Sequence, residues 1–573
     1  MRSTTTAEKT STEPVFADRG AEVHVIVIGG GVNGTGVARD CALRGLRVAL
    51  FERNDIAFGA SGNSSGMIHG GPRYLSSDPD VTYSSCLDSG HIQTIAPHLL
   101  FRIPFLVPVF ERSWLVAKST LAAYDAFFEA YDRYQPLKRG KPHVLLGADE
   151  LRELEPGLVE TSGGVSFDEW GIDGVRLCIA NLVDALEHGA EAHVHTTVTQ
   201  ILRHDDGRVA GVRYRNLLTG ETGIKTSRMV VNASGAWAPI TASLGGIEPA
   251  SVRIRPGKGI HVVLDRRLTN YAIIAKAIDG RQVFLLPWQN VSVLGTTDDD
   301  YYGDLDDVVA TKDEVRYLFQ AIARVFPSVR DARAIGTWGG VRPTLYTWGL
   351  TEDELSREHE IVDHEAHGAL GAYSMIGGKL ASYRMFAAEM TDIIGRRLGC
   401  VERSRTHVCA LPGGEEQVDP MALVERGGME AVTATRLEYR HGGRSLRILD
   451  RMLKDPRQSS VVCDCEPVTD AEIRYVLDCE LARTVEDVSR RTRLGLGACG
   501  GMRCAARCGR IVAEQTGLPP EQGILQALEF LSNARRRRFS AMGPVQARQE
   551  ALALAALRAE LGSGLTEAAR GLS

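Results

Sequence analysis

The feature that most constrains this chain is a glycine-rich turn between a predicted strand and a predicted helix near the N-terminus. Gly29, Gly31 and Gly34 form the pattern GxGxxG directly after the apolar run VHVIVI, and a second apolar run ends at Glu52. Small residues in such a turn let backbone N–H groups approach a pyrophosphate, and an acid after the second strand can bind a ribose hydroxyl. The segment predicts a dinucleotide-binding βαβ unit. The alternative is an ordinary turn with Glu52 on the surface, and the pattern alone does not separate NAD from FAD.

Beyond this unit, strand-like and helix-like segments alternate, which predicts an α/β body. The predicted strands cover 164–167, 194–202, 283–286 and 291–295, and the predicted helices cover 175–188 and 312–325. The turn-rich stretch CALPGGEEQVDP then marks a boundary. We predict five parts: a disordered lead at 1–21, the body at 22–399, a linker with helices at 400–458, a cysteine-rich segment at 459–520, and a helical basic tail at 521–573.

The charge balance excludes a general attraction to nucleic acid. The chain has 66 basic and 72 acidic residues, so local cations must hold any anionic ligand. No apolar run reaches the about 20 residues that cross a bilayer, and the first residues lack the apolar core of a secretory signal. We therefore expect a cytoplasmic protein. The run from Arg535 to Arg538 is expected to be a solvated face, with binding to a partner or to lipid headgroups as the second interpretation.

Six of the eleven cysteines fall between residues 463 and 508. Four of them form a C-x-C pair and a C-x4-C pair: Cys463 with Cys465, and Cys499 with Cys504. Four thiolates in two close pairs can ligate a 2Fe-2S cluster, and they also suit a tetrahedral zinc site. Cys479 and Cys508 are expected to be buried free thiols, although either could replace one of the four ligands.

Several longer blocks resemble the family of FAD-dependent glycerol-3-phosphate dehydrogenases. The block ERNDIAFGASGNSSGMIHGGPRYL, from Glu52 to Leu75, resembles the FAD-binding stretch, and VVNASGAW, from Val230 to Trp237, resembles a second cofactor-contacting turn. Four more blocks fit the same family: GKGIHVVLD, DGRQVFLLPWQNVSVLGTTDDDYYGD, WGGVRPTLY and IGGKLASYR. The resemblance implies FAD as cofactor. It also implies a glutathione-reductase-type FAD-binding domain with a mixed β-sheet substrate domain.

The resemblance assigns a set of residues to FAD: Gly29, Gly31, Gly34, Glu52, Arg53, Ser61, Ser65, His69, Gly235, Gly377 and Gly378. Gly377 and Gly378 precede a predicted helix, so their N–H groups and the helix dipole would stabilise negative charge on the flavin. An ordinary helix start is the alternative.

The resemblance also assigns the substrate contacts, which are Arg73, Tyr74, Lys258, Arg342 and Lys379. Arg342 and Lys379 are in the catalytic group as well, because a guanidinium or ammonium can balance a phosphate. For the base we favour His261 over His69, since KGIH resembles a substrate-side motif whereas MIHGG would place its histidine against the flavin. A core histidine is the alternative for both. Pro72 stands where the family motif has leucine, which leaves the substrate less defined.

The cysteine-rich segment resembles the 2Fe-2S domain of the bacterioferritin-associated-ferredoxin type. Its start, CDCEPVTDAEI, contains Thr469 and Glu472 at capping-box spacing. A body of this kind joined to such a segment resembles the large subunit of the anaerobic members of the family. The resemblance implies a small, mainly helical C-terminal region that carries the cluster.

We therefore expect oxidation of glycerol 3-phosphate to dihydroxyacetone phosphate by hydride transfer to flavin N5. Electrons would pass through the 2Fe-2S cluster to a quinone or to a membrane-associated partner subunit. Oligomerisation, and peripheral association with the inner face of the membrane through partners, are compatible with this function. The alternatives are the same chemistry on another polyol phosphate or a 2-hydroxy acid, and a non-catalytic subunit that relays electrons.

Overall fold

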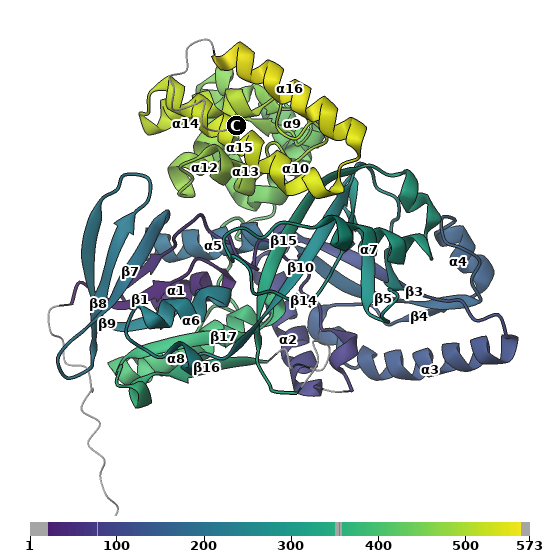
Figure 1. Cartoon of the computed structure of the whole chain (residues 1–573), viewed down its shortest axis with the longest axis horizontal. Helices are drawn as coiled ribbons and strands as arrows, with labels where there is room; N and C mark the ends of the chain where they lie inside the picture. Colours follow the sequence, from purple (N-terminus) through teal and green to yellow (C-terminus); the bar gives the residue numbers. More distant parts are fainter. Residues whose placement is uncertain (1–20, 77, 350–354, 356–357, 563–573) are drawn as a thin grey trace, which may run out of the picture.

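The N-terminal part of the chain folds around a largely parallel sheet. A computed structural model describes residues 21–76, 78–349, 355 and 358–562 (Figure 1). The central strand β1 (Val23–Ile28) is parallel to β2 (Val48–Phe51) and to β9 (Thr222–Asn232). Further strands extend the sheet: β6 (Glu191–His193), β17 (Ala372–Gly377), the antiparallel edge β16 (His359–Asp363), and the hairpin of β7 (Thr196–Arg203) and β8 (Val209–Asn216).

Both faces of this sheet are covered, which explains the valine and isoleucine runs in its strands. One face shares a core with the helices α1 (Val32–Leu43), α5 (Gly174–Glu187) and α8 (Tyr383–Leu398). The other face packs against the β7–β8 hairpin and the short helix α6 (Ala238–Ser243). The predicted βαβ unit is therefore confirmed, with α1 joining β1 to β2.

A second, mixed sheet forms the other half of the body. Its strands are β14 (Asp299–Asp300), β10 (Ile254–Leu264), β13 (Val291–Gly295), β12 (Gln282–Trp288), β11 (Ala272–Lys276), β3 (Leu100–Val109), β5 (Gly163–Ile172), β4 (Val144–Leu146) and β15 (Ala334–Leu345). All neighbours are antiparallel except β11 and β3, which run parallel. Helices α2 (Pro79–Ile95), α3 (Trp114–Asp132), α4 (Ala148–Leu154) and α7 (Lys312–Ala323) complete this half. The predicted combination of a dinucleotide-binding sheet with a mixed sheet is confirmed.

The C-terminal region is mainly helical and lies on top of the body in Figure 1. Its elements are α9 (Pro420–Gly427), α10 (Ala431–His441), α11 (Ser445–Lys454), β18 (Val461–Cys463), β19 (Val468–Thr469), α12 (Asp470–Cys479), α13 (Val485–Thr492), α14 (Ala505–Thr516), α15 (Pro520–Arg538) and α16 (Pro544–Gly562). One apolar core joins residues of α10, α12, α14, α15 and α16. The predicted division at residue 520 therefore falls inside a single core.

Some sequence predictions for this region are confirmed and others are wrong. The Thr469 hydroxyl caps α12 by accepting the Glu472 N–H at 3.3 Å, but the Glu472 carboxylate binds Arg440 at 2.7 Å instead of completing a capping box. Cys508 is buried as predicted, whereas Cys479 ends α12 and is exposed. The disordered lead was predicted for residues that lie, apart from residue 21, outside the described part of the chain.

Three of the four arginines at the end of α15 form ion pairs within the molecule. These pairs are Arg536 with Asp307 at 2.5 Å, Arg537 with Glu486 at 2.9 Å, and Arg538 with Glu550 at 2.8 Å. Arg538 is only 4% exposed, so the expectation of a solvated face is wrong for this residue. Among the described helices, none combines the length and the apolarity that crossing a membrane requires.

Candidate active site

A cavity of about 600 Å³ runs along the glycine-rich turn and continues to the mixed sheet. Its walls come from the first βαβ unit, the loop after β2, the turns after β9 and β17, and strands β3, β5, β12 and β15. Cavities of this size that combine apolar walls with a few convergent polar groups are typical of cofactor and substrate sites. The site therefore lies where the two halves of the body meet.

The dinucleotide turn has the geometry that its glycines predict. Gly29 adopts a φ of 115°, and a Cβ at Gly34 would lie 2.0 Å from the Gly29 carbonyl oxygen. Gly34 thus permits close packing of helix on strand and does not line the cavity, whereas Gly29 and Gly31 do. Glu52 also lines the cavity and accepts hydrogen bonds from Gly30 N–H at 2.6 Å and Asn54 N–H at 2.8 Å. Burial raises the pKa of Glu52 despite these two bonds.

The loop after β2 supplies three more of the predicted cofactor residues. Arg53 lines the cavity and pairs with Asp306 beside the ring of Trp237. Ser61 Oγ accepts a hydrogen bond from Val32 N–H at 2.9 Å, which ties the loop to the first turn of α1. Ser65 lines the cavity as well, and its Oγ lies 2.8 Å from a histidine nitrogen of β10. All three polar side chains are therefore fixed by contacts with their surroundings.

The far side of the cavity contains Gly235, Gly377 and Gly378, all with positive φ. The predicted role of the Gly378 N–H is contradicted, because this group donates to the Glu358 carbonyl at 3.0 Å. The start of α8 is occupied too. Buried Asp88 accepts from the N–H groups of Arg384 and Met385 at 3.1 and 3.2 Å, so the carboxylate of Asp88 already meets the positive end of this helix dipole.

Two predicted cationic side chains line the cavity, Arg342 from the mixed sheet and Lys379 from the turn after β17. Arg342, on β15, donates to Asp298 Oδ1 at 3.1 Å and to Thr296 Oγ1 at 3.0 Å. Lys379 Nζ lies 4.0 Å from the ring centroid of Tyr74 and 3.4 Å from Ser85 Oγ. Arg342, Lys379 and Tyr74 all line the cavity, as predicted. The structure thus brings these three predicted substrate residues together.

One further cation in the cavity was missed by the sequence analysis. Arg281 lines the cavity and donates to the Asp298 carbonyl oxygen. It belongs to the block DGRQVFLLPW, which resembles the family, but it stands in no recognisable ligand pattern of its own. Only the pairing of β11 with β12 brings the turn that carries it to the cavity.

Three other substrate-side predictions have different outcomes. Lys258 does not line the cavity, because its ammonium pairs with Glu314 at 2.9 Å and the residue is 7% exposed. Arg73 lies in the short 3₁₀ turn Pro72–Tyr74, and its side chain falls outside the described part of the structure. Pro72 is the first residue of this turn, a position that tolerates its fixed φ and missing N–H. Pro72 itself forms part of the cavity wall.

The two candidate histidines occupy different environments. His69 lines the cavity. His261, on β10, is 1% exposed and does not line the cavity; its Nε2 lies 2.8 Å from Ser65 Oγ, and its ring stacks on Trp338. Burial lowers the pKa of His261 to about 3, with the charge of Arg342 acting in the same direction. Of the two histidines, only His69 lines the cavity in the described part of the chain.

The four predicted cluster cysteines form two thiol pairs, Cys465 with Cys499 and Cys463 with Cys504. Cys465 Sγ lies 3.8 Å from Cys499 Sγ, and a hydrogen bond from Cys504 lowers the pKa of Cys463 to about 6. The loop between them packs closely, since a Cβ at Gly497 would lie 2.3 Å from the Cys465 Cβ. Across residues 21–562 as described, no group of three or more His, Cys, Asp or Glu side chains is arranged as a metal site.

Comparison with known proteins assigns the chain to a family. A model described as "FAD dependent oxidoreductase" matches residues 24–384, and one described as "C-terminal domain of alpha-glycerophosphate oxidase" matches residues 404–522. The anaerobic glycerol-3-phosphate dehydrogenase of Escherichia coli (strain K12) has a subunit that is 33% identical over 519 residues, which make up 89% of this chain and 91% of that protein. Glycerol-3-phosphate dehydrogenase of Mycobacterium leprae (strain TN) is 31% identical over 516 residues, with coverage of 87% and 86%.

The likeness extends to a solved structure. The glycerol-3-phosphate dehydrogenase from Bacillus halodurans, complexed with FAD, has a TM-score of 0.70 at 24% identity and covers 91% of this chain and 96% of its own. This match shows a shared fold, and the cavity lies along the predicted cofactor turns. The chain therefore belongs to the FAD dependent oxidoreductase family, is homologous to this subunit of the anaerobic glycerol-3-phosphate dehydrogenase, and has FAD as its cofactor.

Proposed function

We propose that this protein oxidises glycerol 3-phosphate to dihydroxyacetone phosphate. The observation that carries the proposal is a group of three cations that line one cavity with the dinucleotide turn, in addition to Arg53 of the loop after β2: Arg281, Arg342 and Lys379. Acidic neighbours such as Asp298, which pairs with Arg342, balance part of this charge. A phosphate dianion offers several oxygens to such a group of cations, and a guanidinium can grip two of them. A 2-hydroxy acid carries one carboxylate and matches three cationic side chains less well.

The residues of the cavity suit the removal of a hydroxyl proton and of a hydride. FAD, when bound, supplies the hydride acceptor at flavin N5. We assign His69 as the group that takes the substrate O–H proton, while the C–H bond breaks with its electron pair and the carbonyl forms. Phe105, Phe167 and Phe284 form apolar walls, which exclude water and strengthen the charge contacts. His261 holds the Ser65 hydroxyl in place.

We further propose that the four cysteines of the segment 459–520 hold a 2Fe-2S cluster. The convergence of their thiols in two pairs supports this assignment. Such a cluster, when bound, accepts and passes single electrons. The natural acceptor would then be a quinone or a membrane-associated partner subunit, with the protein on the cytoplasmic side.

Anaerobic reduction of the FAD-loaded protein tests the substrate. Glycerol 3-phosphate should bleach the flavin absorbance, and it should do so faster than another polyol phosphate or a 2-hydroxy acid. If only another compound bleaches the flavin, the proposed substrate is wrong. If none does, the alternative of a non-catalytic relay subunit is favoured.

Metal analysis tests the cluster. We expect iron and acid-labile sulfide in equal amounts, with a paramagnetic signal after reduction. The variant Cys499→Ser should retain flavin bleaching by the substrate and lose transfer to a one-electron acceptor. Zinc in place of iron, or transfer that is unchanged by the substitution, would contradict the assignment.

A further inference from the structure

The loop after β2 has two faces with different surroundings. Residues 52–54 and 58–61 line the cavity, whereas Asp55, Ile56 and Ala57 turn away from it and are 3%, 0% and 0% exposed. Ala57 has a φ of 61°, and its N–H donates to the Gly30 carbonyl at 2.9 Å. A Cβ at Gly30 would lie 2.7 Å from Ile56. The residues that face away from the cavity are therefore buried against the dinucleotide turn.

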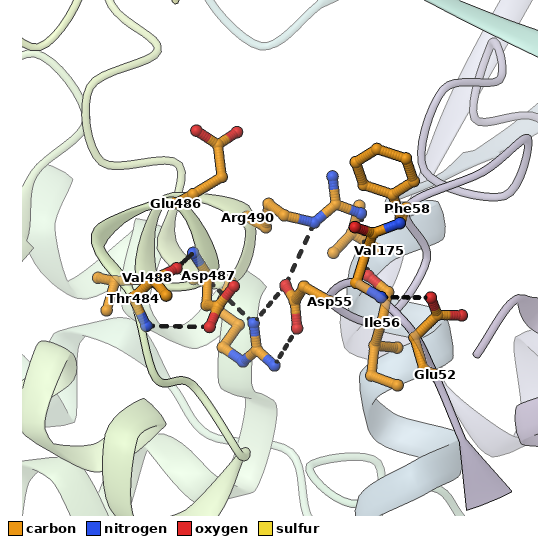
Figure 2. A network of polar contacts seen from close by, with 12 residues as sticks. Glu52, Asp55, Ile56, Phe58, Val175, Thr484, Glu486, Asp487, Val488 and Arg490 are labelled. Atoms are coloured by element: carbon orange, nitrogen blue, oxygen red, sulfur yellow. Dashed lines mark hydrogen bonds and ion pairs between the residues drawn. The ribbon is translucent and has the colours of Figure 1, made fainter. Parts of the chain in front are cut away.

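Helix α13 of the C-terminal region contacts the side of the loop that faces away from the cavity (Figure 2). Arg491 donates to both carboxylate oxygens of Asp55, at 2.7 and 2.8 Å, and its side chain is fully buried. Arg490 donates to the Ile56 carbonyl at 2.9 Å and pairs with Asp55 at 3.2 Å. A buried, bidentate pair is among the stronger polar contacts in proteins. Two adjacent arginines thus bind two consecutive loop residues, Asp55 and Ile56.

Neighbouring contacts join the same two regions. A carboxylate oxygen of Asp487, on α13, lies 2.9 Å from the ring nitrogen Nε2 of His195. The backbone N–H of His195 donates to the Asn54 carbonyl of the loop at 2.9 Å. The Glu480 carbonyl accepts from Arg491, while the Glu480 carboxylate pairs with Arg176 of α5 at 2.5 Å. The loop is therefore connected to the C-terminal region both directly and through neighbouring parts of the body.

The contact between α13 and the loop is closely packed. A Cβ at Gly62 would lie 2.3 Å from the Ala57 carbonyl oxygen and 3.0 Å from both the Arg490 guanidinium and Val175. Interiors packed at this density transmit displacements instead of absorbing them. A shift of α13 would therefore move the part of the loop that forms the cavity wall.

We propose that Arg490 and Arg491 are positioning residues through which the C-terminal region holds the FAD-binding loop in its cavity-forming conformation. FAD binding and the docking of α13 are then coupled, and each stabilises the other because such coupling is reciprocal. The proposal rests on FAD binding, which follows from family membership, and not on the identity of the substrate. Its failure and that of the proposed function are therefore distinguishable.

FAD affinity of the full-length protein tests the positioning role. Arg490→Met removes the contacts with Asp55 and Ile56, and we expect the FAD dissociation constant to rise about 10-fold or more. Arg474→Met is the matched control, because Arg474 pairs with Asp470 and Glu514 within the C-terminal region. It should change the constant less than twofold. Arg490→Lys should recover part of the affinity, since an ammonium can still donate to the Ile56 carbonyl. Equal constants for Arg490→Met and the control would overturn the proposal.

Hydrogen exchange on the unsubstituted protein tests the same coupling without a variant. Amides of α13 should exchange more slowly in the FAD-loaded protein than in the FAD-depleted protein. Amides of α16, which packs on α15 away from the loop, serve as the internal control. Exchange in α13 that is the same with and without FAD would overturn the coupling, because the contact would then hold the two regions together without responding to the cofactor.

Discussion

Two sets of arginines in this protein have different surroundings. In the body, Arg281 and Arg342 line the cavity, and Arg342 retains 28% side-chain exposure. At the junction with the C-terminal region, Arg440 and Arg491 are no more than 1% exposed and point at carboxylates in bidentate geometry. Both sets contact acids, as Arg342 does with Asp298, but the cavity set keeps access to a ligand whereas the junction set is enclosed with its carboxylates.

The difference lies in what surrounds each charge. A buried charge is tolerated only when a partner and hydrogen bonds replace its water, and removing the partner is costly. A cation at a cavity wall keeps access to water or ligand, and its removal costs little until a ligand anion must be bound. Substitutions should therefore affect stability in the buried set and catalysis in the cavity set.

The largest effect is expected from Arg440→Met. Among the described residues, this change leaves the buried Glu472 with His441 at 3.0 Å as its one ionic partner, so folding stability should fall by about 3–5 kcal/mol. Chemical denaturation of the full-length FAD-loaded protein measures the loss. The double variant Arg440→Met with Glu472→Gln should recover part of it, because no unpaired carboxylate is then buried. If Arg440→Met alone is about as stable as the unsubstituted protein, the ion pair contributes no net stabilisation.

Arg342→Met should affect catalysis instead of folding. Loss of a cation from the cavity is expected to lower kcat/KM for glycerol 3-phosphate about 100- to 1000-fold. Arg342→Lys should recover only part of this, since an ammonium lacks the two-pronged geometry. Stability should fall less than for Arg440→Met, because the buried Asp298 keeps Arg255 as a partner at 3.2 Å. A large loss of stability with normal turnover would place Arg342 in the structural set.

The body was predictable from sequence because its signals are local. The spacing of Gly29, Gly31 and Gly34 after an apolar strand requires one turn geometry, and the structure contains that turn. Strand and helix periodicity likewise identified β12, β13, α5 and α7 to within a few residues. The merging of α15 and α16 with the cysteine-bearing helices was not predictable, because it depends on which apolar faces meet in space.

The site was predictable only where one motif carries one role. Glu52 and Arg342 line the cavity, and each stands in a distinctive block. Lys258 and His261 stand in a block of the same kind, yet neither lines the cavity. Lys258 pairs with Glu314, and His261 contacts Ser65 and the ring of Trp338, and the sequence alone predicts none of these contacts. Arg491 carries no motif at all. Its role depends on Asp55, which lies 436 positions earlier in the chain.

The two candidate bases, His69 and His261, also differ in whether they line the cavity. His69→Asn should lower the rate of flavin reduction about 100-fold, since a general base contributes at least this much. His261→Asn should lower it less, because His261 does not line the cavity and a histidine whose burial lowers its pKa to about 3 is a weak proton acceptor. Stopped-flow measurement of flavin reduction compares the two variants directly. A greater loss for His261→Asn would restore the order predicted from sequence.

The smallest effect concerns the pH dependence of the junction. Burial alone would lower the pKa of His195, but the hydrogen bond and charge of Asp487, with a contribution from Asp55, raise it above its ordinary value, while Arg491 opposes them. Protonated His195 therefore stabilises the folded state fully below about pH 6.5, and this contribution is lost as pH rises through the raised pKa. His195→Gln should be less stable than the unsubstituted protein by about 1 kcal/mol at pH 6, and the difference should vanish at alkaline pH. Denaturation curves across this range measure it, and His188→Gln, at a half-exposed histidine at the C-terminal end of α5, provides the control. A difference that is constant with pH would show that the contact acts through packing instead of charge.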